Sequence, residues 1–162
     1  MGRVLTLDEL HQERIRLRDR GLTLVLTNGH FDVLHAGHVR YLQQARALGD
    51  ALAVAVNSDA ATAARKGPLR PIVPEDERAE LVAALACVDY VIIFDALTAE
   101  AVVQAVAPDV YAKGGDYAGP DAPPLPEASI VEAAGGRVVL LPLVPGHSTT
   151  DLVEQILARY RP

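Results

Sequence analysis

Short apolar runs alternate with helical patterns along the whole chain. Five runs rich in Val, Ile and Leu are typical of strands buried on both faces, and they cover residues 22–29, 51–58, 89–94, 109–115 and 137–144. Segments with helical periodicity lie between these runs, at 37–48, 74–86, 98–106 and 126–134, and two more helices are predicted at 5–20 and 149–160. This order predicts a doubly wound α/β fold, in which helices cover both faces of a parallel five-stranded sheet.

The chain of 162 residues has no internal repeat and no long linker. We therefore expect a single domain over 1–162, with an N-terminal helix at about 5–20 and a core at about 22–160. No apolar run is long enough to cross a bilayer, the first residues have no signal-peptide pattern, and one cysteine, Cys87, cannot form an internal disulfide. These features favour a cytoplasmic protein that does not use a membrane. The net charge of −6 argues against a nucleic-acid partner.

Polar or glycine residues follow four of the five predicted strands, in the segments "TNGH", "NSD", "KGGD" and "PGHSTT". Ligands of open α/β sheets bind beyond the carboxyl ends of the strands, so this pattern predicts a ligand site at one edge of the sheet. The only two lysines, Lys66 and Lys113, each precede a glycine. Chance could produce this placement, but it favours two phosphate-binding loops that need a compact ammonium group.

The stretch "TNGHFDVLHAGHVRYL", residues 27–42, holds three of the five histidines at one strand-to-helix turn. A helix that begins here offers unpaired N–H groups and the positive end of its dipole to an anion. His35 and His38 are three residues apart, so both project to one side, and Gly29 and Gly37 let a ligand approach the backbone. This combination suits a phosphate that gains negative charge during a reaction.

Other interpretations of these histidines are weaker. Zinc binding would need Cys or acidic partners at ligand spacing, and they are missing. Helix capping is the alternative for the His35 and His38 pair. His11 is expected to be a solvated helix residue, and His147 to border the site. The segment 116–127, rich in Pro and Gly, is either an exposed loop near the site or a long connection.

Two motifs carry a family resemblance. "GHFDVLHAGH" resembles the H-x-G-H signature of the nucleotidyltransferase superfamily, in the G-x-F-D-x-x-H-x-G-H form of cytidylyltransferase-like enzymes, and "GHSTTDLVEQI" resembles the second signature of that group. The segments "AVNSDAATAARKG", "RPIVPEDERAELVAAL", "VDYVIIF" and "PDVYAKGGDY" are similar to the adenylyltransferase domain of ADP-heptose synthases, the RfaE/HldE type. The similarity runs from about residue 5 to residue 160, and it implies a Rossmann-like sheet.

The resemblance implies a reaction in which a sugar phosphate oxygen attacks the α-phosphorus of a nucleoside triphosphate and pyrophosphate leaves. The implied substrates are ATP, accompanied by Mg²⁺, and D-glycero-β-D-manno-heptose 1-phosphate, and the implied product is ADP-heptose. The alternative is a cytidylyltransferase that uses CTP and glycerol 3-phosphate. Such enzymes carry Arg-Thr-Glu-Gly-Ile before Ser-Thr-Thr, whereas this chain has "LVPGH". A homodimer is compatible with the resemblance.

The resemblance also implies the site residues. His35, His38, Lys66 and Arg78 would be catalytic, with Lys66 and Arg78 facing phosphates, and a non-catalytic nucleotide-binding module would be expected to lack some of these four. Asn57 and Asp59 would join Lys66 in binding the sugar phosphate, and no protein metal site is expected. Asp32 belongs to the motif but has no implied role beyond ordering the turn. The nucleotide would contact Thr27, Asn28, Gly29, His30, Phe31, Asp32, Gly37, Lys113, Gly114, Asp116, His147, Ser148, Thr149 and Thr150.

Overall fold

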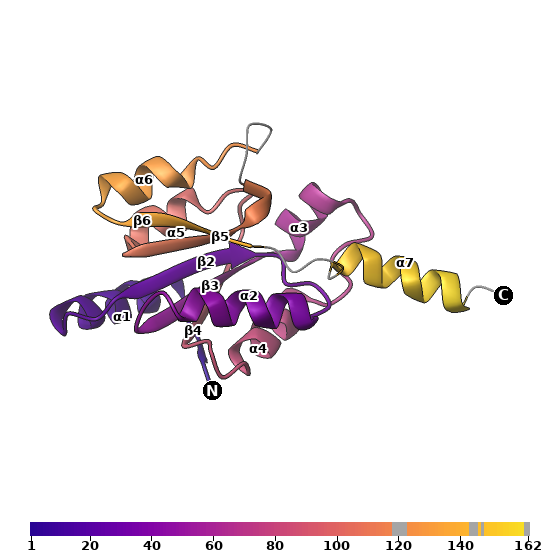
Figure 1. Ribbon diagram of the computed structural model, residues 1–162, viewed down its shortest axis with the longest axis horizontal. Helices are drawn as coiled ribbons and strands as arrows, with labels where there is room; N and C mark the ends of the chain where they lie inside the picture. The colour runs from indigo at the N-terminus through magenta and orange to yellow at the C-terminus, as the bar shows by residue number, and fades with distance from the viewer. Residues whose placement is uncertain (118–122, 143–145, 147, 161–162) are drawn as a thin grey trace.

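A computed structural model describes residues 1–117, 123–142, 146 and 148–160, with the side chain of Asp116 also outside the description (Figure 1). Its centre is a parallel sheet with the strand order β1-β4-β3-β2-β5-β6. The strands are β1 (Arg3–Val4), β2 (Leu24–Gly29), β3 (Ala51–Asn57), β4 (Tyr90–Phe94), β5 (Val110–Gly114) and β6 (Arg137–Leu141). The doubly wound α/β fold predicted from the sequence is thus confirmed.

The predicted number of five strands is wrong, because the described sheet contains a sixth strand, β1, at its edge. β1 has two residues, both exposed, so it carries no apolar run from which it could be recognised. It forms by backbone pairing, with Arg3 opposite Tyr90 and Val4 opposite Val91 of β4.

The helices connect the strands much as expected, with one addition. They are α1 (Leu7–Asp19), α2 (Ala36–Arg46), α3 (Asp59–Lys66), α4 (Glu75–Ala83), α5 (Glu100–Val106), α6 (Glu127–Ala133) and α7 (Thr149–Tyr160), with a short 3₁₀ helix, η1 (Gly115–Tyr117), after β5. The segment of α3 was expected to be a loop. Ser58 caps this helix by accepting a hydrogen bond from Ala61 N at 3.0 Å, and Gly67 ends it with a φ of 99°.

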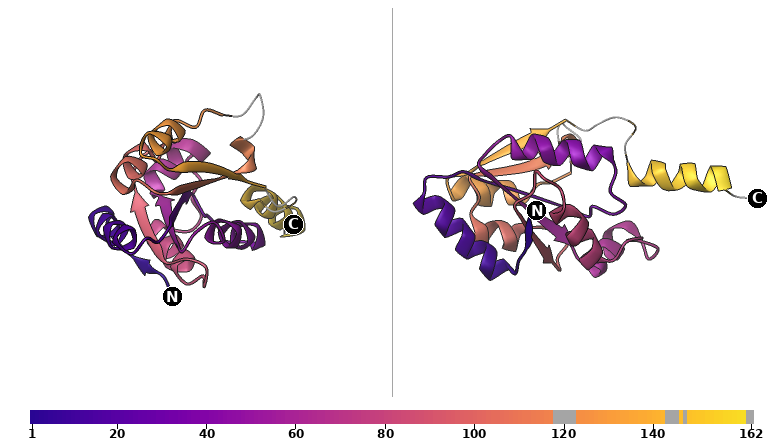
Figure 2. Two further views of the ribbon diagram at one scale, coloured as in Figure 1. Left: turned by 60° about the vertical axis from the view of Figure 1, so that its left-hand side comes forward. Right: turned by 90° about the horizontal axis from the view of Figure 1, so that it is seen from below.

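Two layers of helices bury the two faces of the sheet, as Figure 2 shows. Helices α1, α5 and α6 pack on one face, and α2 and α4 on the other. The side chains of β3 alternate between them: Leu52, Val54 and Val56 point toward α2 and α4, while the alanines between them point toward α1 and α5. All residues of this central strand are buried, which explains its continuous apolar run.

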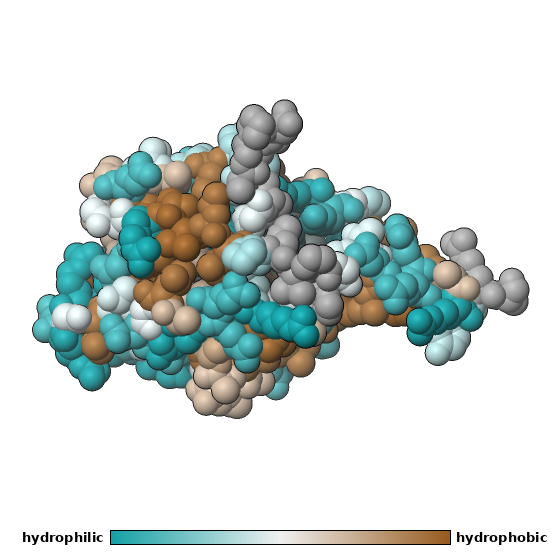
Figure 3. Space-filling model, viewed as in Figure 1, coloured by the Kyte–Doolittle hydropathy of each residue, from teal (hydrophilic) through white to brown (hydrophobic). Residues whose placement is uncertain are grey.

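The periphery of the molecule is less completely covered by helices than the centre of the sheet. Hydrophobic surface gathers over the edge strand β6 (Figure 3), and Leu140 of this strand is exposed. Helix α7 runs outward from the body in Figure 1 and in the right view of Figure 2. Among the described residues, no helix combines the length and hydropathy that a bilayer-spanning segment needs.

Candidate active site

The carboxyl ends of the central strands open into a pocket of about 580 Å³. It lies where the strand order reverses, since β3 adjoins β2 on one side and β5 adjoins it on the other. Such switch points are the usual ligand sites of open parallel sheets. The pocket is therefore at the sheet edge that the polar strand ends predicted, with Asn28 and Gly29 of β2 and Lys113 and Gly114 of β5 in its wall.

His35 and His38 stack against each other at the start of α2. Their ring centroids are 3.9 Å apart with an angle of 23° between the planes, and both rings line the pocket. His35 is also the N-cap of α2, because its Nδ1 accepts a hydrogen bond from Gly37 N at 3.1 Å. Capping and pocket lining are therefore not alternatives. The cap occupies Nδ1 and orients the ring, so this side chain would contact a ligand through Nε2.

The environment of His38 keeps its imidazole neutral at physiological pH. Burial, followed by the neighbouring His35 ring, lowers the pKa of His38 to about 4, although the Asp32 carboxylate acts in the opposite direction. The Nδ1 atom of His38 is buried and has no hydrogen-bond partner among the described residues.

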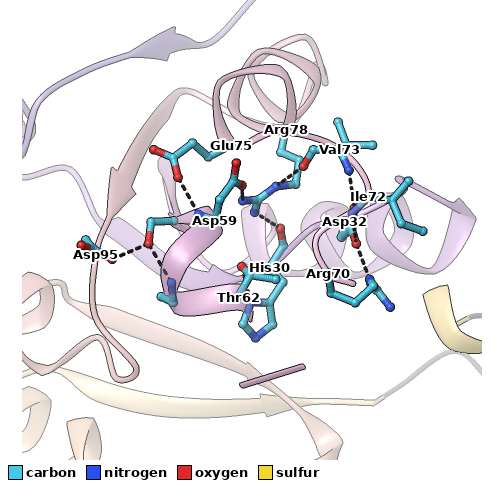
Figure 4. Close-up of polar contacts among 12 residues, drawn as sticks. His30, Asp32, Asp59, Thr62, Arg70, Ile72, Val73, Glu75, Arg78 and Asp95 are labelled. Atoms are coloured by element: carbon cyan, nitrogen blue, oxygen red, sulfur yellow. Dashed lines mark hydrogen bonds and ion pairs between the residues drawn. The ribbon is translucent and has the colours of Figure 1, made fainter. Parts of the chain in front are cut away.

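Asp32 ties the turn before α2 to a distant segment (Figure 4). Its carboxylate accepts a hydrogen bond from Arg70 Nε at 2.6 Å and from the backbone nitrogens of Ile72 and Val73 at 3.0 Å. Burial alone would raise the pKa of Asp32, but these hydrogen bonds and the Arg70 charge outweigh it and lower the pKa. The backbone carbonyl of Asp32 also accepts the Thr149 hydroxyl at 2.7 Å, which brings the two sequence motifs together.

The turn itself has an unusual backbone. Phe31 and Val33, on either side of Asp32, have positive φ angles of 48° and 52°. Non-glycine residues rarely adopt this conformation, and β-branched residues such as Val33 avoid it most. The contacts of Asp32 compensate for the strain, because they hold the turn in place from both sides.

Arg78 does not line the pocket, so its place differs from the expectation that this side chain faces the phosphates. The side chain is completely buried, and its guanidinium donates to the carbonyl oxygens of Val73 and His30 and to the Asp59 carboxylate at 2.7 Å (Figure 4). Asp59, expected to bind the sugar phosphate, is the carboxylate partner in this contact and likewise does not line the pocket. Arg78 thus holds the backbone of His30 in place, and Asp59 binds the same guanidinium.

Lys66 is the last residue of α3, not part of a loop, and its exposed side chain lines the pocket. The adjacent Arg65, which was not among the predicted site residues, lines the pocket too. Burial and then the charges of Lys66 and Arg65 lower the pKa of His30 to about 4, and His30 Nδ1 lies 3.0 Å from the Thr62 hydroxyl. This end of α3 is thus a local positive site in a chain of net negative charge.

A second lysine site lies at the end of β5. The amide oxygen of Asn28 accepts hydrogen bonds from the Tyr111 hydroxyl at 2.6 Å and from Lys113 Nζ at 2.9 Å. The Lys113 ammonium also lies 4.6 Å from the centroid of the Tyr117 ring. Lys113 is buried and belongs to β5, within the strand predicted over 109–115, and the loop expected to hold its ammonium begins only after Gly114. Tyr111 and Tyr117 are therefore two further residues of this site that were not predicted. Their only signal in the sequence is their place beside "KGGD".

Most of the predicted site residues meet in this pocket. Those in its wall are Asn28, Gly29, His30, Phe31, His35, Gly37, His38, Asn57, Lys66, Lys113, Gly114, Ser148 and Thr149. Thr27 is buried beneath it, with its hydroxyl 2.7 Å from the Tyr41 hydroxyl, and Asp32 and Thr150 also do not line it. His147 and the side chain of Asp116 lie outside the described residues.

Comparison with known proteins places this site in a family. A family model described as cytidylyltransferase-like matches residues 26–135, which is more than half of the 162 residues. The chain therefore belongs to the cytidylyltransferase-like family, as the two motifs predicted.

Two relatives show which members of the family this chain is similar to. The chain is 51% identical over 147 residues to the bifunctional protein HldE of Syntrophotalea carbinolica, a match that covers 88% of this chain and 29% of that protein. It is 46% identical over 159 residues to HldE of Citrifermentans bemidjiense, covering 98% of this chain and 32% of that protein. The chain thus spans about a third of the length of these curated relatives.

A solved structure is also similar. The lipopolysaccharide core biosynthesis protein from Thermoplasma volcanium superimposes with a TM-score of 0.60 at 31% sequence identity. The match covers 76% of this chain and 98% of that chain. The chain is therefore similar to this protein in both sequence and fold.

Proposed function

We propose that residues 1–162 act as one nucleotidyltransferase domain that transfers AMP from ATP to D-glycero-β-D-manno-heptose 1-phosphate, giving ADP-heptose and pyrophosphate. The observation that carries the transferase activity is the stacked His35 and His38 pair in the pocket wall at the start of α2. The similarity to HldE proteins and to the adenylyltransferase domain of ADP-heptose synthases supports the choice of substrates. A cytoplasmic location and a homodimer belong to this proposal.

The reaction needs charge stabilisation more than acid–base chemistry. A phosphate oxygen of the acceptor attacks the α-phosphorus in line, its new bond to phosphorus forms, and the bond between the α-phosphorus and the bridging oxygen breaks, so pyrophosphate leaves with the electron pair. The attacking oxygen is already anionic and requires no protein base. The N–H groups at the start of α2, the two imidazoles and Lys66 are placed to stabilise the charge that develops on the phosphates.

Magnesium would enter with the triphosphate. The described residues contain no group of three or more His, Cys, Asp or Glu side chains that could hold a metal ion. Mg²⁺ commonly binds through substrate phosphates and retains several waters, so it does not depend on a protein cage. Its contribution when bound would be to neutralise phosphate charge.

The base preference is tested by product analysis. We expect wild-type protein to release pyrophosphate and form a nucleotide sugar from ATP and heptose 1-phosphate, with kcat/KM for CTP lower by roughly 100-fold, because a site that hydrogen-bonds one base leaves polar groups unpaired with another. Turnover of CTP with glycerol 3-phosphate alone would replace ATP and heptose in the proposal. Binding of ATP without pyrophosphate release from any acceptor would indicate a non-catalytic module.

Lys66 is expected to act on the triphosphate without supporting the fold. Lys66→Ala should raise the KM for ATP and lower kcat, together by roughly tenfold or more in kcat/KM, since it removes a charge from the phosphate site. The melting temperature should stay unchanged, because an exposed lysine at a helix end adds little to stability. Arg18→Ala, at an exposed position of α1, is the matched control and should change neither quantity. Unfolding of Lys66→Ala would show a structural role instead.

A further inference from the structure

The pocket is lined by residues from helices on both faces of the sheet, and we divide its lining into two lobes on that basis. The nucleotide lobe, formed by His35, Gly37, His38, Ser148 and Thr149, lies beside α2 and the start of α7. The second lobe, formed by Asn57, Leu97, Thr98, Tyr117 and Glu127, lies at the starts of α5 and α6. The proposed function does not explain why the second lobe exists, since the catalytic histidines and the second motif all belong to the first.

The second lobe contains a buried carboxylate. Glu127, the first residue of α6, is 3% exposed, and its Oε1 accepts a hydrogen bond from Ala99 N at 2.8 Å. Burial and the nearby Glu127 carboxylate both raise the pKa of Tyr111. Glu127 thus has two neighbours, Ala99 N and the Tyr111 hydroxyl. An ionised carboxylate can accept about four hydrogen bonds, so acceptor capacity remains at the pocket wall.

Asn57 adds a second acceptor to the same lobe. It is 4% exposed at the end of β3, and its amide nitrogen donates to the Ala96 carbonyl at 3.1 Å. This hydrogen bond turns the amide oxygen, an acceptor, away from Ala96. The same contact holds the segment after β4, which carries Leu97 and Thr98, in the wall of the lobe.

The charges divide the pocket between two kinds of ligand group. Lys66, Arg65 and Lys113 lie at the ends of α3 and β5, where they attract phosphates, whereas the Glu127 carboxylate repels them. Acceptors such as a carboxylate and an amide oxygen pair instead with hydroxyl donors. The Tyr117 ring adds an aromatic surface beside them.

We infer that the second lobe binds the hydroxyl-bearing sugar ring of the acceptor, with Glu127 accepting a hydrogen bond from a sugar hydroxyl. This inference rests on the proposed function and extends it, since it assigns the acceptor subsite and a specificity-determining residue. It also places the acceptor phosphate near Lys66 and Lys113, between the sugar and the triphosphate.

The test compares Glu127→Gln with wild type in steady-state kinetics. Glutamine keeps the size of the side chain and an oxygen for Ala99 N, but it lacks the charge. We expect the KM for the sugar 1-phosphate to rise roughly tenfold or more, as for loss of a hydrogen bond to a charged group, while the KM for ATP changes less than about twofold. Glu132→Gln, at an exposed position of the same helix, is the matched control and should leave both values unchanged.

A set of monodeoxy sugar 1-phosphates separates recognition from a purely structural effect. Wild type should discriminate roughly tenfold against the analogue that lacks the hydroxyl bound by Glu127, and Glu127→Gln should lose this discrimination. If Glu127→Gln does not fold, Leu97→Trp replaces it, because this side chain is 57% exposed at the lobe and a larger group should raise the KM for the sugar phosphate alone.

The outcomes distinguish the inference from the function on which it rests. An active wild type with equal effects of Glu127→Gln on both KM values, and with unchanged discrimination among the deoxy sugars, would overturn the inference and leave the proposed function standing. A wild type that turns over ATP with no sugar phosphate would overturn both.

Discussion

Replacement of His38 by alanine is expected to lower kcat by about 100-fold or more, while ATP binding weakens far less. The neutral imidazole lines the pocket at the start of α2, so it can form a hydrogen bond that strengthens as charge develops on the phosphates. Loss of one such preorganised donor typically costs two to three orders of magnitude in kcat. Single-turnover and steady-state kinetics would separate this loss from any change in ATP affinity.

The controls for this prediction use the other histidines. His11→Ala should retain full activity, because His11 is exposed on α1 and contacts the Ala105 carbonyl. His35→Asn should keep the cap of α2, since asparagine is a good N-cap, but lose the imidazole that stacks on His38. Near-normal turnover of both His38→Ala and His35→Asn would contradict the proposed role of the pair.

Arg78→Met is expected to lower the free energy of unfolding by about 3 kcal/mol, the typical loss when one partner of a buried polar network is removed. The completely buried guanidinium donates hydrogen bonds to the carbonyls of His30 and Val73 and to the Asp59 carboxylate. Methionine has no such donor, so all three acceptors would lose this hydrogen bond. Urea denaturation measures this change. Arg16→Met is the control, because the Arg16 side chain is 69% exposed and its ion pair with Glu13 adds little.

This measurement also decides between the two roles considered for Arg78. A variant that keeps its stability but loses affinity for ATP would restore the phosphate contact implied by the family resemblance. A variant that loses stability would support the positioning role, since Arg78 holds the backbone of His30 at the pocket.

The order of strands and helices was predictable because it depends on local patterns. The apolar run of β3 and the helical period of α2 are each visible within a dozen residues, and burial on both faces leaves little ambiguity. β1 and α3 were missed for the opposite reason. β1 is two exposed residues that pair with β4, and α3 is a short helix whose limits depend on the cap at Ser58 and on Gly67.

The histidine pair and the lysines at the strand ends were likewise predictable, because their chemistry and spacing suffice to suggest a phosphate site. The roles of Arg78, Asp59 and Glu127 were not, since each depends on a partner from a distant segment: Arg78 reaches His30 across 48 residues, and Glu127 reaches Ala99 across 28. An arginine or a glutamate has the same formula at a surface or in a core. Only the packing of the sheet and its helices decides whether the charged group contacts solvent, substrate or another part of the chain. For these residues, that environment determines their role.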